Sequence, residues 1–216
     1  MTKSITLVLA THNKGKTAEI RDFFKDFPVI IKNLDDFGPI HHLEEDGDTF
    51  DENAYKKSSF TARILGLPAL ADDSGLLVEA LDGARGVHSA RYAGEKATDE
   101  QKCMKLLQEM EGKFNRRAAF ECVISIAVPA GPALTYEARC EGLIAEQPAG
   151  SNGFGYDPIF FYPPYQKTFA EMTRKEKSLV SHRGKAVAEL KGEFDKAMIW
   201  IRQNLPISKT FNCQGE

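Results

Sequence analysis

A polar loop near the start of the chain carries the first residue types suited to chemistry. It lies between an apolar run and a helical pattern, where a helix N-terminus offers unpaired backbone N–H groups and the positive end of the helix dipole. Its residues are Thr11, His12, Asn13, Lys14, Gly15 and Lys16. They suit a polyphosphate, but only the end of the loop matches a P-loop, because Ala10 stands where that motif requires glycine. From this segment alone, a phosphate cradle and a solvated turn with surface lysines remain equally open.

Carboxylates gather in two places where a divalent cation could bind. Asp72 and Asp73 follow a predicted strand, and adjacent carboxylates near a core cost free energy unless a cation or hydrogen bonds offset their repulsion. Magnesium is usually held by one or two carboxylates together with substrate phosphates, so this pair favours a functional interpretation. The acidic run Glu44–Asp48, taken alone, favours a solvated loop.

A glycine-rich loop over 150–157 surrounds two aromatic residues, Phe154 and Tyr156. Glycine lets a backbone approach a flat ligand closely, and either aromatic ring is able to stack on a base. The loop alone favours a simpler interpretation, a turn with two core aromatics.

Basic residues surround a predicted helix start at Ser181. This residue is a favourable N-cap, which places His182 and Arg183 in the first helical turn, where the helix dipole disfavours cations; Lys177 lies just upstream. An anion or an electron-rich base edge would account for them, and a surface helix start is the equal alternative. A Ser-His-Asp hydrolase is a poor fit, because the sequence has no GxSxG turn.

Alternating strand and helix patterns must position these groups. Apolar runs predict strands over 5–10, 29–31, 68–71 and 159–162, with 76–81 as a continuation or a new strand. Two β-rich runs over 118–128 and 134–144 predict an antiparallel hairpin. Helices are expected up to Pro28, from Thr49 to about Leu65, from Thr98, and from Ser181 past Ile201. The pattern predicts an α/β protein with a mixed sheet.

Bulk composition excludes several classes of protein. The 216 residues allow one sizeable core or two small lobes beside a cleft. A formal net charge of −3 does not suggest nucleic acid or a membrane as a partner, and no long apolar run predicts a membrane span. The four scattered cysteines favour reduced thiols, with Cys103, Cys122 and Cys140 buried, and no signal peptide is recognisable, so a cytoplasmic location is expected.

Six motifs in order resemble those of the inosine/xanthosine triphosphate pyrophosphatase family, which removes non-standard purine nucleotides. The resemblance runs from about residue 5 to residue 190. The motifs are T-x-N-x-x-K from Thr11, E-E-x-G-x-T-F-x-E-N-A from Glu44, A-D-D-S-G-L from Ala71, S-A-R-Y-A-G from Ser89, G-F-G-Y-D-P-I-F from Gly153 and S-H-R-G from Ser181. Each motif alone is weak evidence for the family, whereas six motifs in this order are specific for it.

The resemblance implies an elongated mixed sheet with flanking helices, two lobes around a central cleft, and a homodimer. It implies one domain over 1–205 and Mg²⁺-dependent hydrolysis of ITP, dITP or XTP to the monophosphate and diphosphate. The resemblance does not constrain residues 206–216, which are expected to form a flexible tail. Asp73 would activate water and bind magnesium with Glu45, and Glu44 or Asp72 would be further candidates. The substrate-binding residues implied are Thr11–Lys16 and Lys57 for phosphates, Ser74, then Phe154, Gly155, Tyr156 and Asp157 for the base platform, and Lys177, His182 and Arg183 for the base edge.

Base selection follows from hydrogen-bond complementarity. A 6-oxo purine offers an acceptor where adenine offers an amino donor, so a donor such as Arg183 would leave ATP with two donors facing each other. Guanine shares the 6-oxo group, so GTP must be excluded through its 2-amino group. A pyrophosphatase of other specificity and a nucleotide sensor that does not cut are the alternatives, and the carboxylates around Asp73 disfavour the sensor.

Overall fold

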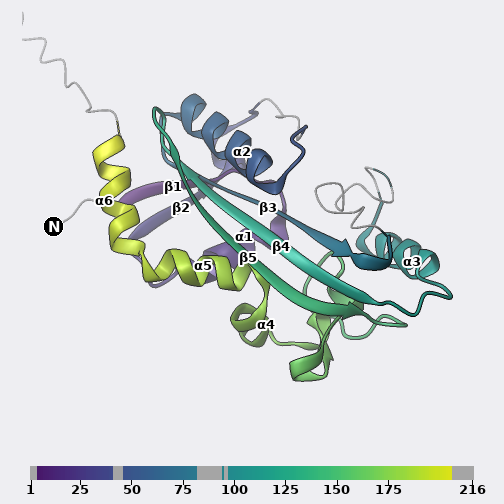
Figure 1. Ribbon diagram of the computed structural model, residues 1–216. Helices are drawn as coiled ribbons and strands as arrows, with labels where there is room; N and C mark the ends of the chain where they lie inside the picture. Colours follow the sequence, from purple (N-terminus) through teal and green to yellow (C-terminus); the bar gives the residue numbers. More distant parts are fainter. Residues whose placement is uncertain (1–3, 41–45, 82–93, 95–96, 206–216) are drawn as a thin grey trace, which may run out of the picture.

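One mixed seven-stranded sheet forms the spine of the molecule (Figure 1). The computed structural model describes residues 4–40, 46–81, 94 and 97–205. The strand order is β2-β1-β3-β4-β5-β6-β7. The strands are β1 Ile5–Leu9, β2 Val29–Asn33, β3 Ala69–Val78, β4 Arg117–Ala127, β5 Ala133–Ile144, β6 Phe160–Tyr162 and β7 Lys167–Thr168. β1 pairs in parallel with β2 and β3, whereas all pairs from β3 to β7 are antiparallel.

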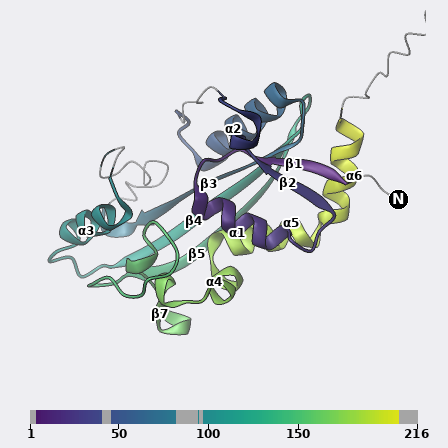
Figure 2. The ribbon, with the colours of Figure 1, turned by 180° about the vertical axis from the view of Figure 1, so that it is seen from behind.

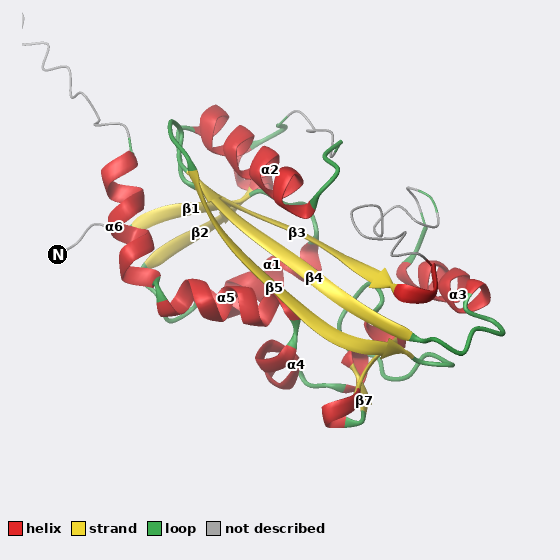
Figure 3. Ribbon diagram, in the orientation of Figure 1, coloured by secondary structure: helices red, strands yellow, loops and turns green. Residues whose placement is uncertain are grey.

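Helices flank the sheet, as Figure 3 shows. Those of the described part are α1 Lys14–Phe24, α2 Phe50–Leu65, α3 Asp99–Glu109, α4 Arg174–Val180, α5 His182–Gly192 and α6 Phe194–Asn204. Alternate residues of β1 show which face each helix covers, because side chains alternate along a strand. Leu7 packs in one cluster with Ile20 of α1 and Val187 of α5, whereas Val8 packs with Ala62 of α2. α1 and α5 therefore lie on the face opposite α2 (Figures 1 and 2).

Two large hydrophobic clusters lie along the long strands. The first surrounds β1, α1, α5 and α6. The second contains Leu106 of α3 and the rings of Phe120, Phe160 and Phe169; the Phe120 and Phe160 ring centroids lie 4.6 Å apart. The strands β3, β4 and β5 extend between the two clusters (Figure 1). The expected α/β fold, an elongated mixed sheet with flanking helices and two lobes, is confirmed.

β3 is one continuous strand, so the carboxylate pair lies inside a strand rather than at a strand end. β1 pairs with β3 only at Ala69 and Leu70. Beyond these residues no described strand pairs with this edge of β3, while its other edge stays paired with β4 up to Val78. Asp72 and Asp73 thus lie where β1 ends and the edge of β3 becomes available to a ligand.

The C-terminal helices differ from expectation in two ways. The single long helix is wrong: α5 and α6 break at Glu193, which has φ −109° and ψ 14°, directly after Gly192, a residue of low helix propensity. The short helix α4 was not predicted from the sequence, although Thr173 and Glu176 form a capping box at its start. α4 carries Lys177.

Several smaller expectations are confirmed. Thr49 caps α2, and Thr98 and Gln101 form the capping box of α3. Cys103, Cys122 and Cys140 are free thiols in buried positions, whereas Cys213 lies outside the described residues, as does the expected tail. Among the described helices, none combines the length and the apolar character that crossing a bilayer requires.

Candidate active site

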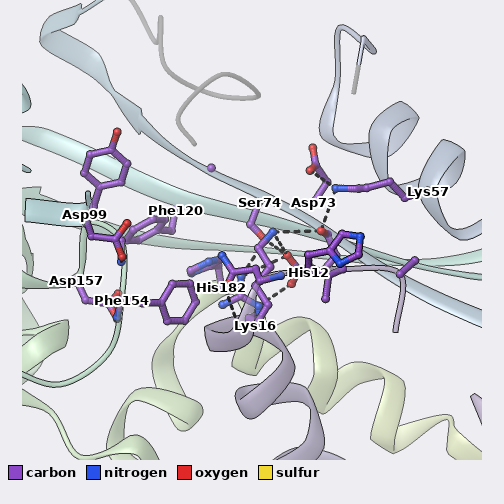
Figure 4. A pocket seen from close by; sticks show the side chains of 18 of the residues that line it. His12, Lys16, Lys57, Asp73, Ser74, Asp99, Phe120, Phe154, Asp157 and His182 are labelled. Atoms are coloured by element: carbon purple, nitrogen blue, oxygen red, sulfur yellow. Dashed lines mark hydrogen bonds and ion pairs between the residues drawn. The ribbon is translucent and has the colours of Figure 1, made fainter. Parts of the chain in front are cut away.

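A pocket of about 340 Å³ opens beside the part of the β3 edge that no described strand pairs with (Figure 4). Its lining residues come mainly from the β1–α1 loop, α2, β3, α3, β4, the loop before β6, α4 and α5. Fourteen of the expected site residues line it: Thr11, His12, Asn13, Lys16, Lys57, Asp73, Ser74, Phe154, Gly155, Tyr156, Asp157, Lys177, His182 and Arg183. The structure therefore brings together segments that are far apart in the sequence. Lys14 and Gly15 are not among the lining residues, and Glu45 lies outside the described part of the chain.

The β1–α1 loop is held in shape by its own side chains. The Asn13 carboxamide oxygen caps α1 by accepting the N–H of Lys16 at 3.0 Å, and Thr11 Oγ1 accepts the N–H of Asn13 at 3.1 Å. His12 is exposed and lies 3.3 Å from Asp35. Lys16 places its ammonium group at the pocket wall, so it is the loop cation that faces a ligand.

Gly15 contributes through packing. A Cβ atom at this position would lie 2.5 Å from Cδ1 of the Phe154 ring. Real Cβ atoms do not approach so closely, so Gly15 allows the first turn of α1 to lie directly against that ring. The phosphate-side loop and the aromatic platform are therefore in direct contact.

Asp73 faces α2 and pairs with a lysine. Its Oδ1 lies 2.6 Å from Lys57 Nζ, and both side chains are nearly buried at the pocket wall. Lys57 Nζ also donates to the backbone carbonyl of Asp72 at 3.2 Å. A carboxylate and two lysines, Lys16 and Lys57, consequently lie at the same end of the pocket.

Asp72 faces the opposite side of the sheet and is fully engaged by neighbours. Its Oδ2 accepts from Arg183 Nε at 2.6 Å, and its Oδ1 lies 2.6 Å from Lys16 Nζ and accepts from Ser74 Oγ at 2.5 Å. The Cys122 thiol donates to Oδ2 at 3.3 Å. Burial alone raises the pKa of Asp72, but Arg183 and Lys16 outweigh it and hold that pKa well below its usual range. Asp72 thus organises the cations and the hydroxyl group around it.

The aromatic platform rests on a second buried carboxylate. Asp157 Oδ2 accepts the N–H of Phe154 at 2.9 Å and lies 2.6 Å from Lys177 Nζ. Lys177 Nζ lies 4.7 Å from the centroid of the Phe154 ring. Burial raises the pKa of Asp157 despite the attraction of Lys177. The loop, its ring and Lys177 are held as one unit.

His182 is buried and stacks on Phe120. The two ring centroids lie 4.6 Å apart with an interplanar angle of 12°. Burial and then the nearby Arg183 lower the pKa of His182 well below its usual value, so the imidazole is neutral. Its Nδ1 is buried with no hydrogen-bond partner in the described part of the chain.

Arg183 is deeply buried beside the pocket. Its side chain is 2% exposed, and besides Asp72 it contacts Ser74 Oγ from Nη2 at 3.2 Å and Glu19 Oε2 from Nη1 at 2.6 Å. Two carboxylates of the protein itself therefore supply the anions that make a cation tolerable in the first turn of α5. Most of its N–H groups are committed before any ligand binds.

Three site residues were missed from the sequence. Glu19 pairs with both Arg183 and Lys177, Phe120 carries the stack with His182, and Asp99 accepts the N–H of Gly155 at 2.6 Å. Asp99 directly follows the N-cap of α3. Acidic residues are favoured in the first turn of a helix, so nothing in the sequence indicated the contact of Asp99 with Gly155. Glu19 lies three residues after Lys16, so helical periodicity places both on one face of α1.

The donor set at this end of the pocket fits magnesium held jointly with a substrate. Asp73 offers a hard carboxylate oxygen beside Lys16 and Lys57. Within the residues that the structure describes, no group of three or more acidic, histidine or cysteine side chains forms a metal site. One or two carboxylates plus substrate phosphates are the usual arrangement for Mg²⁺, so one described carboxylate at the phosphate end agrees with it.

Fold and pocket together define an α/β protein whose site suits a ligand with an anionic end and a flat aromatic end. The chain belongs to the Ham1 family, whose model matches residues 7–193. It is 57% identical over 203 residues to the dITP/XTP pyrophosphatase of Desulfotalea psychrophila, covering 94% of this chain and 91% of that protein. It is 60% identical over 195 residues to the protein of the same name in Syntrophobacter fumaroxidans, covering 90% of this chain and 84% of that protein. The resemblance seen in the sequence motifs is confirmed.

Solved structures share the fold. The HAM1 protein of Coxiella burnetii has a TM-score of 0.81 and 41% identity, covering 89% of this chain and 99% of that one. The Ham1 protein of Staphylococcus aureus has a TM-score of 0.80 and 39% identity with the same coverages, 89% and 99%. The described architecture is therefore that of the family.

Proposed function

We propose that this protein is a nucleoside triphosphate pyrophosphatase that hydrolyses dITP, XTP and ITP to the monophosphate and diphosphate. The observation that carries the proposal is a single pocket with Lys16, Lys57 and Asp73 at one end and Phe154 with His182 at the other. The names of the relatives from Desulfotalea psychrophila and Syntrophobacter fumaroxidans support the same substrates.

At the phosphate end, the chain's own residues bind and orient the triphosphate. Lys16 and Lys57 place positive charge beside the crowded phosphate oxygens, where charge develops during attack at the α-phosphate. Asp73 accepts the proton of the attacking water, and it would hold Mg²⁺ together with Glu45. The metal supplies charge neutralisation on the phosphate oxygens when it is bound.

At the base end, donors select a 6-oxo purine. The ammonium group of Lys177 has three hydrogens. Among the described residues, Glu19 and Asp157 accept two of them, so one is left for a ligand in the pocket. That hydrogen, with the remaining Nη1 hydrogen of Arg183, suits an acceptor at position 6 of the base. Neutral His182 adds either a donor or an acceptor, and Phe154 provides the stacking face. With adenine a buried donor would face a donor, which is rejected.

We also propose an oligomeric state, a location, a domain extent and roles for Lys14 and Gly15. A homodimer and a cytoplasmic location suit an enzyme that clears the nucleotide pool, and the chain is proposed to act as one domain over 1–205 with a tail over 206–216. Lys14 and Gly15 act at the phosphate end through the helix start, with Gly15 giving room to Phe154.

The test is diphosphate release from ITP, dITP, XTP, GTP, ATP and CTP with Mg²⁺. We expect the first three to be hydrolysed far faster than the others. Equal rates with CTP would indicate a pyrophosphatase of other specificity. Tight binding of ITP without diphosphate release would indicate a nucleotide sensor, and either result would overturn the proposal.

A further inference from the structure

Glu19 of α1 is a nearly buried carboxylate to which the proposed reaction gives no role. Its side chain is 13% exposed, its Oε2 lies 2.6 Å from Arg183 Nη1, and its Oε1 lies 2.8 Å from Lys177 Nζ. Burial raises the pKa of Glu19, but Arg183 and Lys177 outweigh it and lower that pKa below its usual value. Each oxygen of an ionised carboxylate therefore holds one of the two cations on the base side of the pocket.

The same helix carries the cation on the phosphate side. Lys16 and Glu19 lie three residues apart on α1, so both project from one face of that helix. Lys16 Nζ lies 2.6 Å from Asp72, whose other oxygen lies 2.6 Å from Arg183 Nε. One helical turn thus separates the phosphate-side cation from the carboxylate that holds the base-side cations.

The two cations that Glu19 holds lie beside the aromatic platform. Lys177 Nζ is 4.7 Å and Arg183 Cζ is 5.6 Å from the centroid of the Phe154 ring. Asp157 holds Lys177 from its other side at 2.6 Å. A base stacked on this ring would meet their remaining N–H groups at its edge, in positions that Glu19 fixes.

We propose that Glu19 is a positioning residue that sets base specificity by fixing Lys177 and Arg183 relative to each other and to Lys16. The inference rests on the proposed hydrolysis of non-standard purine nucleotides. Without the Glu19 carboxylate, each cation keeps one carboxylate partner and gains freedom to turn. The N–H groups that face the base edge then hold less fixed positions, so a 6-amino purine is rejected less strongly.

Glu19→Gln tests the inference with a matched control on the same helix. Asp22→Asn removes an exposed carboxylate whose described partner is Lys25, at 3.3 Å. In Glu19→Gln we expect the ratio of kcat/KM for ITP over ATP to fall about tenfold, the size of one lost hydrogen bond to a charged group. In Asp22→Asn we expect that ratio to stay within about twofold, because an exposed ion pair contributes little.

A second measurement separates positioning from general damage. Inorganic diphosphate occupies the phosphate end alone, so its inhibition constant is expected to stay within about twofold in Glu19→Gln, since only base-side contacts are lost. Loss of diphosphate inhibition together with base selectivity would indicate a damaged pocket and would overturn the inference.

Glu19→Asp keeps the charge but is one methylene shorter, so it cannot hold both cations at their present separation. We expect it to fold and to lose part of the selectivity for ITP over ATP. If Glu19→Gln does not fold, Glu19→Asp replaces it in the comparison with Asp22→Asn. A folded variant at Glu19 that keeps the wild-type ratio of ITP to ATP would overturn the inference. A wild-type protein that hydrolyses neither ITP nor XTP would instead overturn the proposed function.

Discussion

Asp72 and Asp73 are consecutive residues of β3 whose carboxylates leave opposite faces of the sheet. Asp72 binds Arg183 and Lys16 toward α5 and α1, whereas Asp73 binds Lys57 toward α2. Adjacent residues of a strand must diverge in this way, so the pair does not have to share one cation. One carboxylate organises the charged walls of the pocket, and the other remains for the chemistry.

Asp73→Asn should lower kcat for ITP hydrolysis by about 10²–10⁴-fold, the usual contribution of a positioned general base. The amide is nearly the same size but is a poor base and a poor metal ligand, so ITP should still bind. Single-turnover hydrolysis and equilibrium binding of ITP are the measurements. Near-normal turnover in the folded variant would remove Asp73 from the reaction.

Asp72→Asn should instead destabilise the fold. The substitution leaves Arg183 and Lys16 without their shared buried counter-charge, and breaking a buried pair by removing one partner costs about 3–5 kcal/mol. Urea unfolding followed by circular dichroism measures the loss, with Asp73→Asn as the matched comparison on the neighbouring residue. A smaller loss for Asp72→Asn than for Asp73→Asn would contradict the assignment of Asp72 as the organising carboxylate.

Gly15→Ala should displace the Phe154 ring, because the added Cβ would lie 2.5 Å from Cδ1 of that ring. We expect KM for ITP to rise about tenfold, as misplacing a binding group by a fraction of an ångström can do. Gly192→Ala is the control, since a Cβ there meets nothing within 4 Å. Equal KM values for ITP in the two variants would show that substrate binding does not depend on the contact of Gly15 with the Phe154 ring.

His182 should make stability depend on pH. Its pKa in the folded protein is held well below the usual value, mainly by burial, so below about pH 6.5 the unfolded chain binds a proton that the folded chain does not. The stability that neutral His182 contributes is complete above that pH and is lost as the pH falls, by up to about 1.4 kcal/mol per pH unit.

His182→Phe isolates this effect while keeping a ring against Phe120. The free energy of unfolding, measured by urea titration at several pH values on both sides of the unfolded histidine pKa, should fall less steeply on acidification in the variant. Parallel curves for the two proteins would mean that His182 titrates normally in the folded state.

Much of the fold could be predicted from local patterns. Two β-rich runs located β4 and β5, and the capping box of Thr98 and Gln101 located the start of α3. The helix α4 was missed because its seven residues are too few for a periodic stripe. The break at Glu193 was missed because the apolar positions continue through it from α5 into α6.

The charge pairing inside the site could not be predicted. Glu19 meets Lys177 and Arg183 across 158 and 164 residues of sequence, and no local pattern reports contacts at that separation. The sequence therefore suggested Arg183 as a donor for the base edge, but its ion pairs with Asp72 and Glu19 follow from how α1, β3 and α5 pack.

The proposed reaction is a single cut between the α- and β-phosphates by water that attacks the α-phosphate. Hydrolysis of ITP in heavy-oxygen water, followed by mass spectrometry of both products, tests it directly. We expect one labelled oxygen in inosine monophosphate and none in diphosphate. Label in diphosphate, or release of inorganic phosphate from the γ-position, would contradict attack at the α-phosphate.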